Sequence, residues 1–249
     1  QNFESKYTVP DKNIYDQVIK KVILIPNSIK SFIPNHPIID SVFLEHNKTF
    51  NDICLIKDVG FNYWSKGGGK TRSLNSVGKR VLYEGTKENE NDVPFIKGRD
   101  IFKYKINPPS NYLKYNYDSF LNENDIFRFS KDFLEITPKL VYRQTSDKII
   151  AAYDENKFYC DKTVHLIVLK RNDIVLLKHL LSLLNSKLFE FFYTDISKEE
   201  TGRTFSQVKT TYIKKLPVVT ENKVITSTIV DYIHFINSNN NIDIRHKLQ

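Results

Sequence analysis

The stretch from residue 93 to residue 104 decides the fold, and it reads Val93-Pro94-Phe95-Ile96-Lys97-Gly98-Arg99-Asp100-Ile101-Phe102-Lys103-Tyr104. An apolar run, 93–96, predicts a strand that ends in a Lys-Gly-Arg-Asp turn, and a second alternating run, 101–106, leaves the turn. Gly98 favours a sharp bend with a close approach of the chain, because glycine adopts a positive φ without a steric cost. Such a bend holds Lys97 and Arg99 at a strand end, where a cation can meet a phosphate or a guanine edge. Local evidence alone also fits a β-hairpin with solvated charges.

The composition is that of an ordinary globular protein of one or two domains. The chain has 249 residues, of which 40% are hydrophobic and 27% charged. A net charge of +8 and a pI near 9.2 favour nucleic acid, an anionic membrane or an acidic partner. The most apolar segment, 174–184, is too short to span a bilayer and is interrupted by Lys178 and His179. We therefore expect a cytoplasmic protein without membrane contact.

The two cysteines, Cys54 and Cys160, are far apart, and no close Cys/His spacing occurs. This predicts no metal site and a reducing compartment. The chain has no methionine and opens on Gln1, which predicts a fragment of a longer protein. Residues 1–48 mix short apolar runs with prolines, and we expect them to connect to an upstream domain.

Glycines and cations are concentrated together between residues 60 and 99. Thr49 predicts an N-cap, followed by a short helix, a strand and Gly60. Strands joined by Gly-rich basic loops fit a surface laid against a polyanion. Seven of the 8 glycines lie in this region, among the cations Lys66, Lys70, Arg72, Lys79, Arg80, Lys97 and Arg99.

Two short motifs resemble catalytic motifs, but each lacks residues that the catalytic motif requires. Gly67-Gly68-Gly69-Lys70-Thr71 ends like a phosphate-binding P-loop, but Trp64 stands where the first glycine belongs. Asn107-Pro108-Pro109-Ser110 resembles the Asn-Pro-Pro-Tyr of adenine methyltransferases, whose aromatic ring stacks on the flipped base. Here the fourth residue is Ser110, and no Gly-rich cofactor turn precedes the motif. We expect a basic loop and a Pro-Pro turn, and no catalytic residue.

Residues 138–168 carry the second informative pattern. Strand-like runs at 140–142 and 149–153 predict a hairpin whose link includes Arg143, Gln144 and Thr145. Arg and Gln are the side chains that read guanine and adenine in the major groove. Residues 158–168 predict a further strand pair, and Asn124 or Asp125 predicts a helix start.

The last part of the sequence predicts helices. A helix from Asn172 to about Tyr193 is expected to be buried, with one stripe made of Ile174, Leu177, Leu181, Leu184, Leu188 and Phe191. Thr204 and Gln207 form a capping-box pattern for a short helix that ends near Leu216-Pro217. Arg203 beside that helix start, with no acidic residue over 201–216, predicts an anion site. A further helical stripe runs over 224–236. The elements together predict an α+β fold, mostly antiparallel and β-rich, with a C-terminal helical part.

Ordered motifs from Thr49 to Pro217 resemble the target-recognition domains of adenine-N6 DNA methyltransferases and of type IIG restriction-modification enzymes. The resemblance includes an entry segment at 49–60, where Phe50-Asn51 stands in place of the usual Leu-Gly. The family's closing Leu-Pro-Ile-Pro is matched only by Leu216-Pro217, since Val218-Val219 follow. The other matching motifs are Gly98-Arg99-Asp100-Ile101, the 139–145 run with Ala151-Ala152-Tyr153-Asp154, Leu183-Leu184-Asn185-Ser186-Lys187-Leu188, and Gly202-Arg203.

The resemblance implies a β-rich target-recognition domain over 49–170 with a helical part over 171–249. It implies sequence-specific binding of double-stranded DNA, while S-adenosylmethionine and catalysis belong to an upstream methyltransferase domain of the same chain, with or without a fused nuclease. The base-edge candidates are Lys97, Arg99, Arg143, Gln144 and Thr145. The phosphate candidates are Lys66, Lys70, Arg72, Arg203, Thr204 and Lys209.

Three alternatives remain open at this point. The first is a specificity subunit of a type I restriction-modification system, which shares these motifs. A long, heptad-patterned final helix would favour it, and the stripe over 224–236 is too short to decide. The second is a nuclease, since Asp147, Glu155 and Lys157 loosely echo an acidic metal site. The third is a carbohydrate- or protein-interaction module, which the aromatic content of 13% permits and which predicts no salt-dependent DNA binding.

Overall fold

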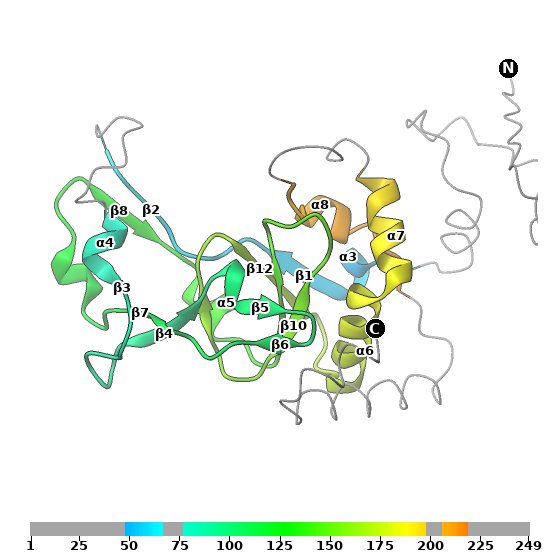
Figure 1. Cartoon of the computed structure of the whole chain (residues 1–249), viewed down its shortest axis with the longest axis horizontal. Helices are drawn as coiled ribbons and strands as arrows, with labels where there is room; N and C mark the ends of the chain where they lie inside the picture. Colours follow the sequence, from blue (N-terminus) through cyan, green and yellow to red (C-terminus); the bar gives the residue numbers. More distant parts are fainter. Residues whose placement is uncertain (1–47, 67–76, 198–205, 219–249) are drawn as a thin grey trace, which may run out of the picture. The chain divides into compact units, whose positions relative to one another are not determined.

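The computed structural model describes residues 48–66, 77–197 and 206–218 (Figure 1). Most of the expected connector, the helix expected over 224–236 and four phosphate candidates lie outside the described residues. Those four are Lys70, Arg72, Arg203 and Thr204.

The first sheet has four strands in the order β1-β12-β9-β10, and all its pairs are antiparallel. The strands are β1 (Cys54–Lys57), β12 (Val164–Leu169), β9 (Lys139–Arg143) and β10 (Ala151–Asp154). The register pairs Ala151 with Tyr142 and Asp154 with Lys139, which confirms the hairpin expected across 140–153.

The second sheet has the order β11-β4-β7-β3. Its strands are β11 (Tyr159–Cys160), β4 (Val93–Ile96), β7 (Asn111–Leu113) and β3 (Leu82–Glu84), and only β11 and β4 pair in parallel. The strand pair expected over 158–168 is therefore wrong. Its two halves, β11 and β12, enter different sheets, so that this one segment joins the sheets.

The turn after β4 differs from the expected hairpin. A short 3-10 helix, η1 (Gly98–Asp100), follows β4, and the run after it folds on itself as β5 (Ile101–Phe102) and β6 (Lys105–Ile106). Tyr104 adopts a φ of 67° in the tight turn between β5 and β6. Gly98 needs no positive φ. Its Cβ would instead lie 3.0 Å from the carbonyl oxygen of Thr163, so the close approach explains the glycine.

A two-stranded ribbon, β2 (Asn62–Ser65) with β8 (Asp125–Arg128), extends away from the first sheet (Figure 1). The helix start expected at Asn124 or Asp125 is wrong. The Asp125 carboxylate accepts a hydrogen bond from Ser65 Oγ at 2.7 Å and pairs with Arg80, so partners distant in sequence hold this segment as a strand. Three short helices complete this part: α4 (Val77–Val81), η2 (Tyr117–Phe120) and α5 (Lys131–Leu134).

A hydrophobic core lies between the two sheets. Val141, Ala152, Val164 and Leu166 of the first sheet pack in one buried cluster with residues of the second. Phe61 is central to it, because its ring lies 5.0 to 5.3 Å from three other phenylalanine rings. The cluster also includes Phe95, Ile96, Ile101, Leu113, Leu134, Tyr159 and Cys160.

Helices cover the other face of the first sheet (Figure 1). They are α3 (Phe50–Ile53), α6 (Ile174–Asn185), α7 (Lys187–Ile196) and α8 (Thr210–Ile213). The expected single helix is two, because Ser186 interrupts it: its hydroxyl donates to Leu183 O and accepts from Phe189 N, which caps α7. This break changes the buried side of the helix. Leu177, Leu181 and Leu184 of the expected stripe are buried, but Ile174, Leu188 and Phe191 are exposed.

The fold is therefore mixed α+β, mainly antiparallel, with helices towards the C-terminus, as expected. The last helix begins later than the capping-box pattern predicted. Gln207 forms a β-bridge with Thr145 instead of a helical turn, and α8 begins at Thr210. Among the residues described, no helix has the length and apolarity needed to cross a bilayer.

Asn185, in the Leu-Leu-Asn-Ser-Lys-Leu motif, completes the edge of the first sheet. Its side-chain amide accepts from Ala151 N and donates to Ala151 O, both at 3.0 Å. Ala151 begins β10, the edge strand, so the amide takes the place of a neighbouring strand. The side chain is 4% exposed. In the sequence this motif serves only to indicate the family resemblance, but in the structure its asparagine has a structural role.

Replacing Asn185 with leucine is expected to lower the free energy of unfolding by about 1–3 kcal/mol. The buried Ala151 N–H loses its acceptor, which costs roughly that amount, while Ala151 O keeps the hydrogen bond from Tyr104 N at 2.9 Å. Urea unfolding of the variant beside Ser182→Ala, a change on the same helix, measures the difference. Equal stability of both variants would contradict this role.

A fully buried ion pair lies at the far end of the same hairpin. Lys139 Nζ is 2.8 Å from the Asp154 carboxylate, and both side chains have no exposed surface. Lys139 also donates to Leu134 O and Ile136 O at the end of α5. Asp154 accepts from the N–H groups of Asn156 and Phe158. All these groups are satisfied, so the pair joins α5 to the hairpin.

Candidate nucleic-acid interface

The five base-edge candidates are brought together around Thr163, a residue that the sequence did not single out. Thr163 Oγ1 accepts from Gly98 N at 2.7 Å, and Thr163 O accepts from Gln144 N at 2.8 Å. Thr163 lies in the link between β11 and β12, where Asp161 accepts from its backbone N–H at 2.9 Å. We call Lys97, Arg99, Arg143, Gln144 and Thr145 the η1 cluster.

Arg143 holds the backbone of the η1 turn. Its Nε donates to Ile101 O at 2.6 Å, and one terminal nitrogen donates to Arg99 O at 3.5 Å. The guanidinium carbon lies 5.1 Å from the centre of the exposed Phe102 ring. Partial burial lowers the pKa of Arg143. Because much of its donor capacity is used on carbonyl groups, this side chain positions the turn.

Arg99 and Lys97 project from the turn towards a carboxylate that the sequence reasoning missed. Arg99 Nη2 donates to Glu84 Oε1 at 2.7 Å, and Lys97 Nζ is 3.6 Å from Glu84 Oε2. The hydrogen bond from Arg99 holds the pKa of Glu84 below its ordinary value. Glu84 ends β3, two strands from β4, so only the order of the second sheet brings these charges together.

Gln144 and Thr145 follow β9 and are tied to the segment before α8. Val208 N donates to Gln144 O at 2.7 Å, and Thr145 pairs with Gln207. Lys209 comes next in this segment; its N–H donates to the Tyr193 hydroxyl at 3.0 Å and its ammonium lies 5.9 Å from the Tyr212 ring centre. One phosphate candidate thus lies beside two base-edge candidates.

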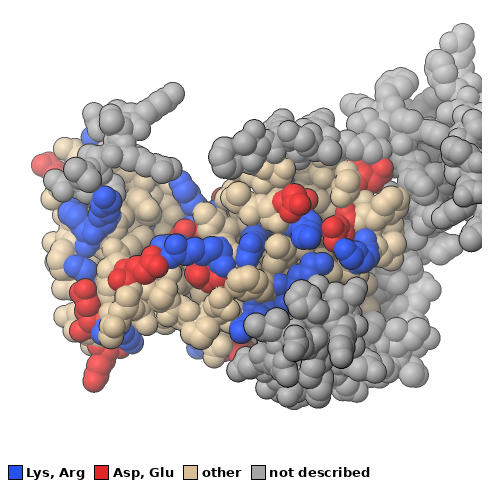
Figure 2. Space-filling model, viewed as in Figure 1, with Lys and Arg blue, Asp and Glu red and all other residues tan. Residues whose placement is uncertain are grey.

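Further cations continue from the η1 cluster beyond Phe102. Lys103 Nζ donates to Asn185 O at 2.9 Å and lies 3.8 Å from Glu190. Burial lowers the pKa of Lys103, with added repulsion from Lys148 and Lys187. Figure 2 shows Lys and Arg side chains across the middle of one face, with acidic side chains between them. No local pattern marks Lys103 in the sequence, because Asn185 and Glu190, which it contacts, are distant along the chain.

Lys66 is placed apart from the η1 cluster. It follows β2 at the end of the β2–β8 ribbon, where its N–H donates to Asn124 O at 2.9 Å and its side chain is exposed. On the same ribbon, the Arg128 guanidinium carbon lies 5.4 Å from the centre of the exposed Trp64 ring. The ribbon therefore presents a second basic and aromatic surface.

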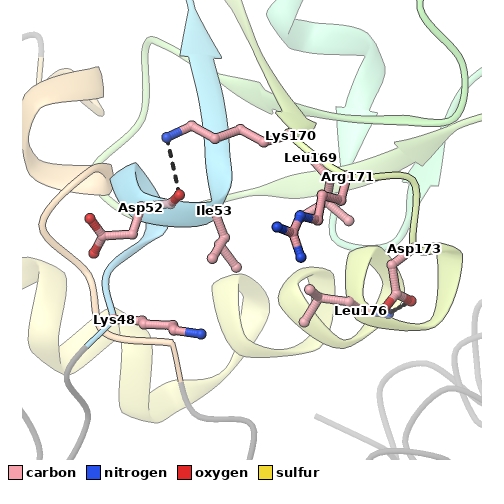
Figure 3. A pocket seen from close by; sticks show the side chains of 8 residues that line it. All are labelled: Lys48, Asp52, Ile53, Leu169, Lys170, Arg171, Asp173 and Leu176. Carbon is pink, nitrogen blue, oxygen red and sulfur yellow. Dashed lines mark hydrogen bonds between the residues drawn. The ribbon is translucent and has the colours of Figure 1, made fainter.

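A cavity of about 450 Å³ opens where the first sheet meets the helices (Figure 3). Lys170 Nζ donates to Asn51 O and Asp52 O, which fixes the end of α3, and Asp173 caps α6 through Leu176 N. The cavity lies beside the last residue of β12, whereas Thr163 comes just before the first residue of that strand. The cavity and the η1 cluster are therefore at opposite ends of β12. Its lining residues are Lys48, Asp52, Ile53, Leu169, Lys170, Arg171, Asp173 and Leu176.

The other candidate catalytic groups are not brought together. Asp147 precedes β10 and Glu155 follows it, so the whole strand, four residues and roughly 13 Å long, lies between the two acidic residues of the nuclease alternative. In the described part of the chain, no three His, Cys, Asp or Glu side chains form a metal-binding group. Burial raises the pKa of Cys54 to about 12, and Cys160 is also buried.

The family of this chain is given by one family model. A family model described as a TaqI-like C-terminal specificity domain matches residues 93–218, just over half of the chain. A solved structure of the type IIG restriction endonuclease BpuSI is similar over 79% of this chain and 28% of that enzyme, with 13% identity and a TM-score of 0.45. No curated protein matches the sequence.

Proposed function

Because this chain belongs to the family of TaqI-like C-terminal specificity domains, we propose that it binds double-stranded DNA and recognises a specific sequence. The observation that carries the proposal is the η1 cluster. Its five residues are of types that can read base edges and lie at or just after the ends of strands of two different sheets, and the backbone N–H groups of Gly98 and Gln144 both donate to Thr163, which holds the two segments together. Lys103 follows β5 near this cluster, and the charges of Lys148 and Lys187 act on it.

The proposed roles divide between bases and phosphates. Lys97, Arg99, Gln144 and Thr145 face base edges, and Arg143 holds the turn that presents them while its remaining N–H groups stay near the same surface. Lys66 and Lys209 contact phosphates, as do Lys70, Arg72, Arg203 and Thr204. Phosphate contacts supply affinity and register, whereas contacts to base edges supply specificity.

The parent enzyme that we propose is a cytoplasmic adenine-specific DNA methyltransferase, alone or fused to a nuclease. Residues 1–48 would lead from its catalytic domain, residues 49–170 would form the recognition part, and residues 171–249 the helical part. S-adenosylmethionine does not fit the residues here. The Asn107–Ser110 loop links β6 to β7, and the nearby Tyr112 ring stacks on Tyr83 with centroids 5.4 Å apart. We assign the cofactor to the upstream domain.

Two alternative functions can be separated from this one by the observations that they predict. A type I specificity subunit would also bind DNA, and a long heptad-patterned final helix would favour it; the stripe over 224–236 is too short to decide and lies outside the described residues. A carbohydrate- or protein-interaction module would show no salt-dependent binding to DNA. The family makes the DNA proposal the stronger one.

The chain is expected to bind a random-sequence duplex with an affinity that falls log-linearly with salt, because each neutralised phosphate releases counterions. Lys209→Ala should weaken binding to all sequences alike and shallow the salt slope by about 1. Fluorescence anisotropy over a salt series measures both.

Lys131→Ala is the matched control for that titration. Lys131 is an exposed lysine on α5, paired with Glu135, and its loss also removes one positive charge. An equal change of the salt slope in both variants would show that the effect of Lys209→Ala comes only from the loss of one positive charge. A folded chain without DNA binding at low salt would contradict the proposed function.

A further inference from the structure

A carboxylate lies in the middle of the cationic η1 cluster, and neither stability nor phosphate binding accounts for it. The side chains of Glu84 and Arg99 are 53% and 58% exposed. Exposed ion pairs contribute only about 0–1 kcal/mol to folding. A carboxylate also repels the DNA backbone. Yet Glu84 accepts from Arg99 at 2.7 Å and lies near Lys97 as well.

The pair has the chemistry of one base pair seen from the major groove. Guanine presents two acceptors there, O6 and N7, and its partner cytosine presents the N4 amino donor beside them. Arginine donates in a planar fork that matches guanine, and glutamate accepts from cytosine. The hydrogen bond between the two side chains occupies one N–H of Arg99 and one carboxylate oxygen. The second Glu84 oxygen lies 3.6 Å from Lys97 Nζ and Arg99 Nε lies 3.9 Å from Asp100, so both longer contacts would give way when the base pair binds.

Building on the DNA recognition proposed above, we propose that Glu84 and Arg99 together read one G·C base pair in the major groove. Arg99 donates to O6 and N7 of guanine, and Glu84 accepts from the N4 amino group of cytosine. Glu84 is thus a residue that determines specificity, although it carries the same charge as DNA.

The turn that carries Arg99 is held rigidly before any DNA arrives. Its backbone is fixed by the bond from Gly98 N to Thr163 Oγ1, by the bond from Lys97 N to Asp100 at 2.8 Å, and by Arg143 on Ile101 O. Glu84 then orients the guanidinium itself. Binding therefore loses little rotamer freedom, which is how preorganisation raises both affinity and discrimination.

The positive charge of Lys97 lowers the repulsion between the Glu84 carboxylate and the DNA phosphates. Its ammonium is 3.6 Å from Glu84 and 5.6 Å from the centre of the Phe95 ring. Lys97 and Arg99 together balance the charges of Glu84 and of Asp100, whose carboxylate lies 3.9 Å from Arg99 Nε, so the Glu84 carboxylate leaves no net negative charge beside the phosphate backbone.

The test is selection of bound sequences from a pool of random duplexes by the whole 249-residue chain. The wild type is expected to enrich a site with at least one fixed G·C pair. Arg99→Ala and Glu84→Gln should each relax that same pair, with a loss of discrimination of about tenfold. Glu84→Gln should also bind random DNA more tightly, because one negative charge is gone. A merely structural glutamate would not give opposite changes in the two readouts.

Glu155→Gln is the matched control, because Glu155 is exposed and follows β10 at the end away from Arg143. It removes the same charge and should leave the selected site unchanged. If Glu84→Gln and Arg99→Ala still select the wild-type site, the base-pair assignment is wrong while DNA recognition stands. If the folded wild type enriches no site and shows no salt-dependent binding, the proposed function fails, and this inference fails with it.

Discussion

Replacing Asp154 with asparagine is expected to lower the free energy of unfolding by about 3–5 kcal/mol, which is typical when one partner of a buried ion pair is removed. The Lys139 ammonium would remain buried with two carbonyl groups and no counter-charge. Asparagine keeps the size of the side chain, so the loss reports charge and not a cavity. Urea unfolding followed by circular dichroism measures it.

A double-mutant cycle separates the pair from its surroundings. Lys139→Met with Asp154→Asn should cost clearly less than the sum of the two single changes, because no buried charge is left alone. Asp147→Asn is the control: it removes the same charge from an exposed residue of the same hairpin. A loss below 1 kcal/mol for Asp154→Asn would show that water or local opening reaches the pair.

Alanine at Gly60 is expected to cost about 3 kcal/mol or more, at the upper end for overpacking. An added Cβ would lie 2.2 Å from Asp161 O and 2.4 Å from Asp161 C. These are backbone atoms, and Phe61 N donates to Cys160 O at 2.9 Å beside them, so the two segments cannot separate without breaking the pairing. The substitution should also displace Thr163 and thereby weaken sequence preference on DNA.

Gly78→Ala provides a comparison with the same chemical change. There the Cβ would meet the Tyr63 ring at 2.5 Å, but the obstacle is the end of a partly exposed side chain that can rotate. Alanine also favours the helix α4 by roughly 1 kcal/mol over glycine. We expect Gly78→Ala to change stability by no more than about 1 kcal/mol. Similar losses in both variants would show that the Asp161 turn moves freely.

The elements that could be predicted from the sequence are those specified by local patterns. The 139–154 hairpin consists of two apolar runs joined by a polar link, and Thr49 caps α3 as expected, with Asp52 accepting from its N–H at 2.7 Å. The elements that were wrong depend on distant partners. Asp125 pairs with Ser65 and Arg80, and Gln207 pairs with Thr145. Neither relation leaves a local signal.

The candidate site was predictable in its residue types but not in its geometry. Arg99 and Arg143 are the kinds of side chain that read DNA, and their motifs marked them. The different roles of these two side chains could not be predicted from the sequence. They depend on which carbonyl groups lie near Arg143, and on the position of Glu84 at the end of β3, in the same sheet as β4. The burial of Lys139 could not be predicted either, because a lysine at the start of a strand is expected to be exposed to solvent.

The division between a fixed backbone and exposed side chains in the η1 cluster has a consequence for evolution. The bonds to Thr163, Asp100 and the Ile101 carbonyl hold the turn, whereas Glu84 and Arg99 extend into solvent. Substitutions at the exposed positions should therefore cost little in folding. Under the DNA recognition proposed above, we expect a library varied at 84, 97, 99 and 145 on an unchanged scaffold to contain variants with new DNA targets.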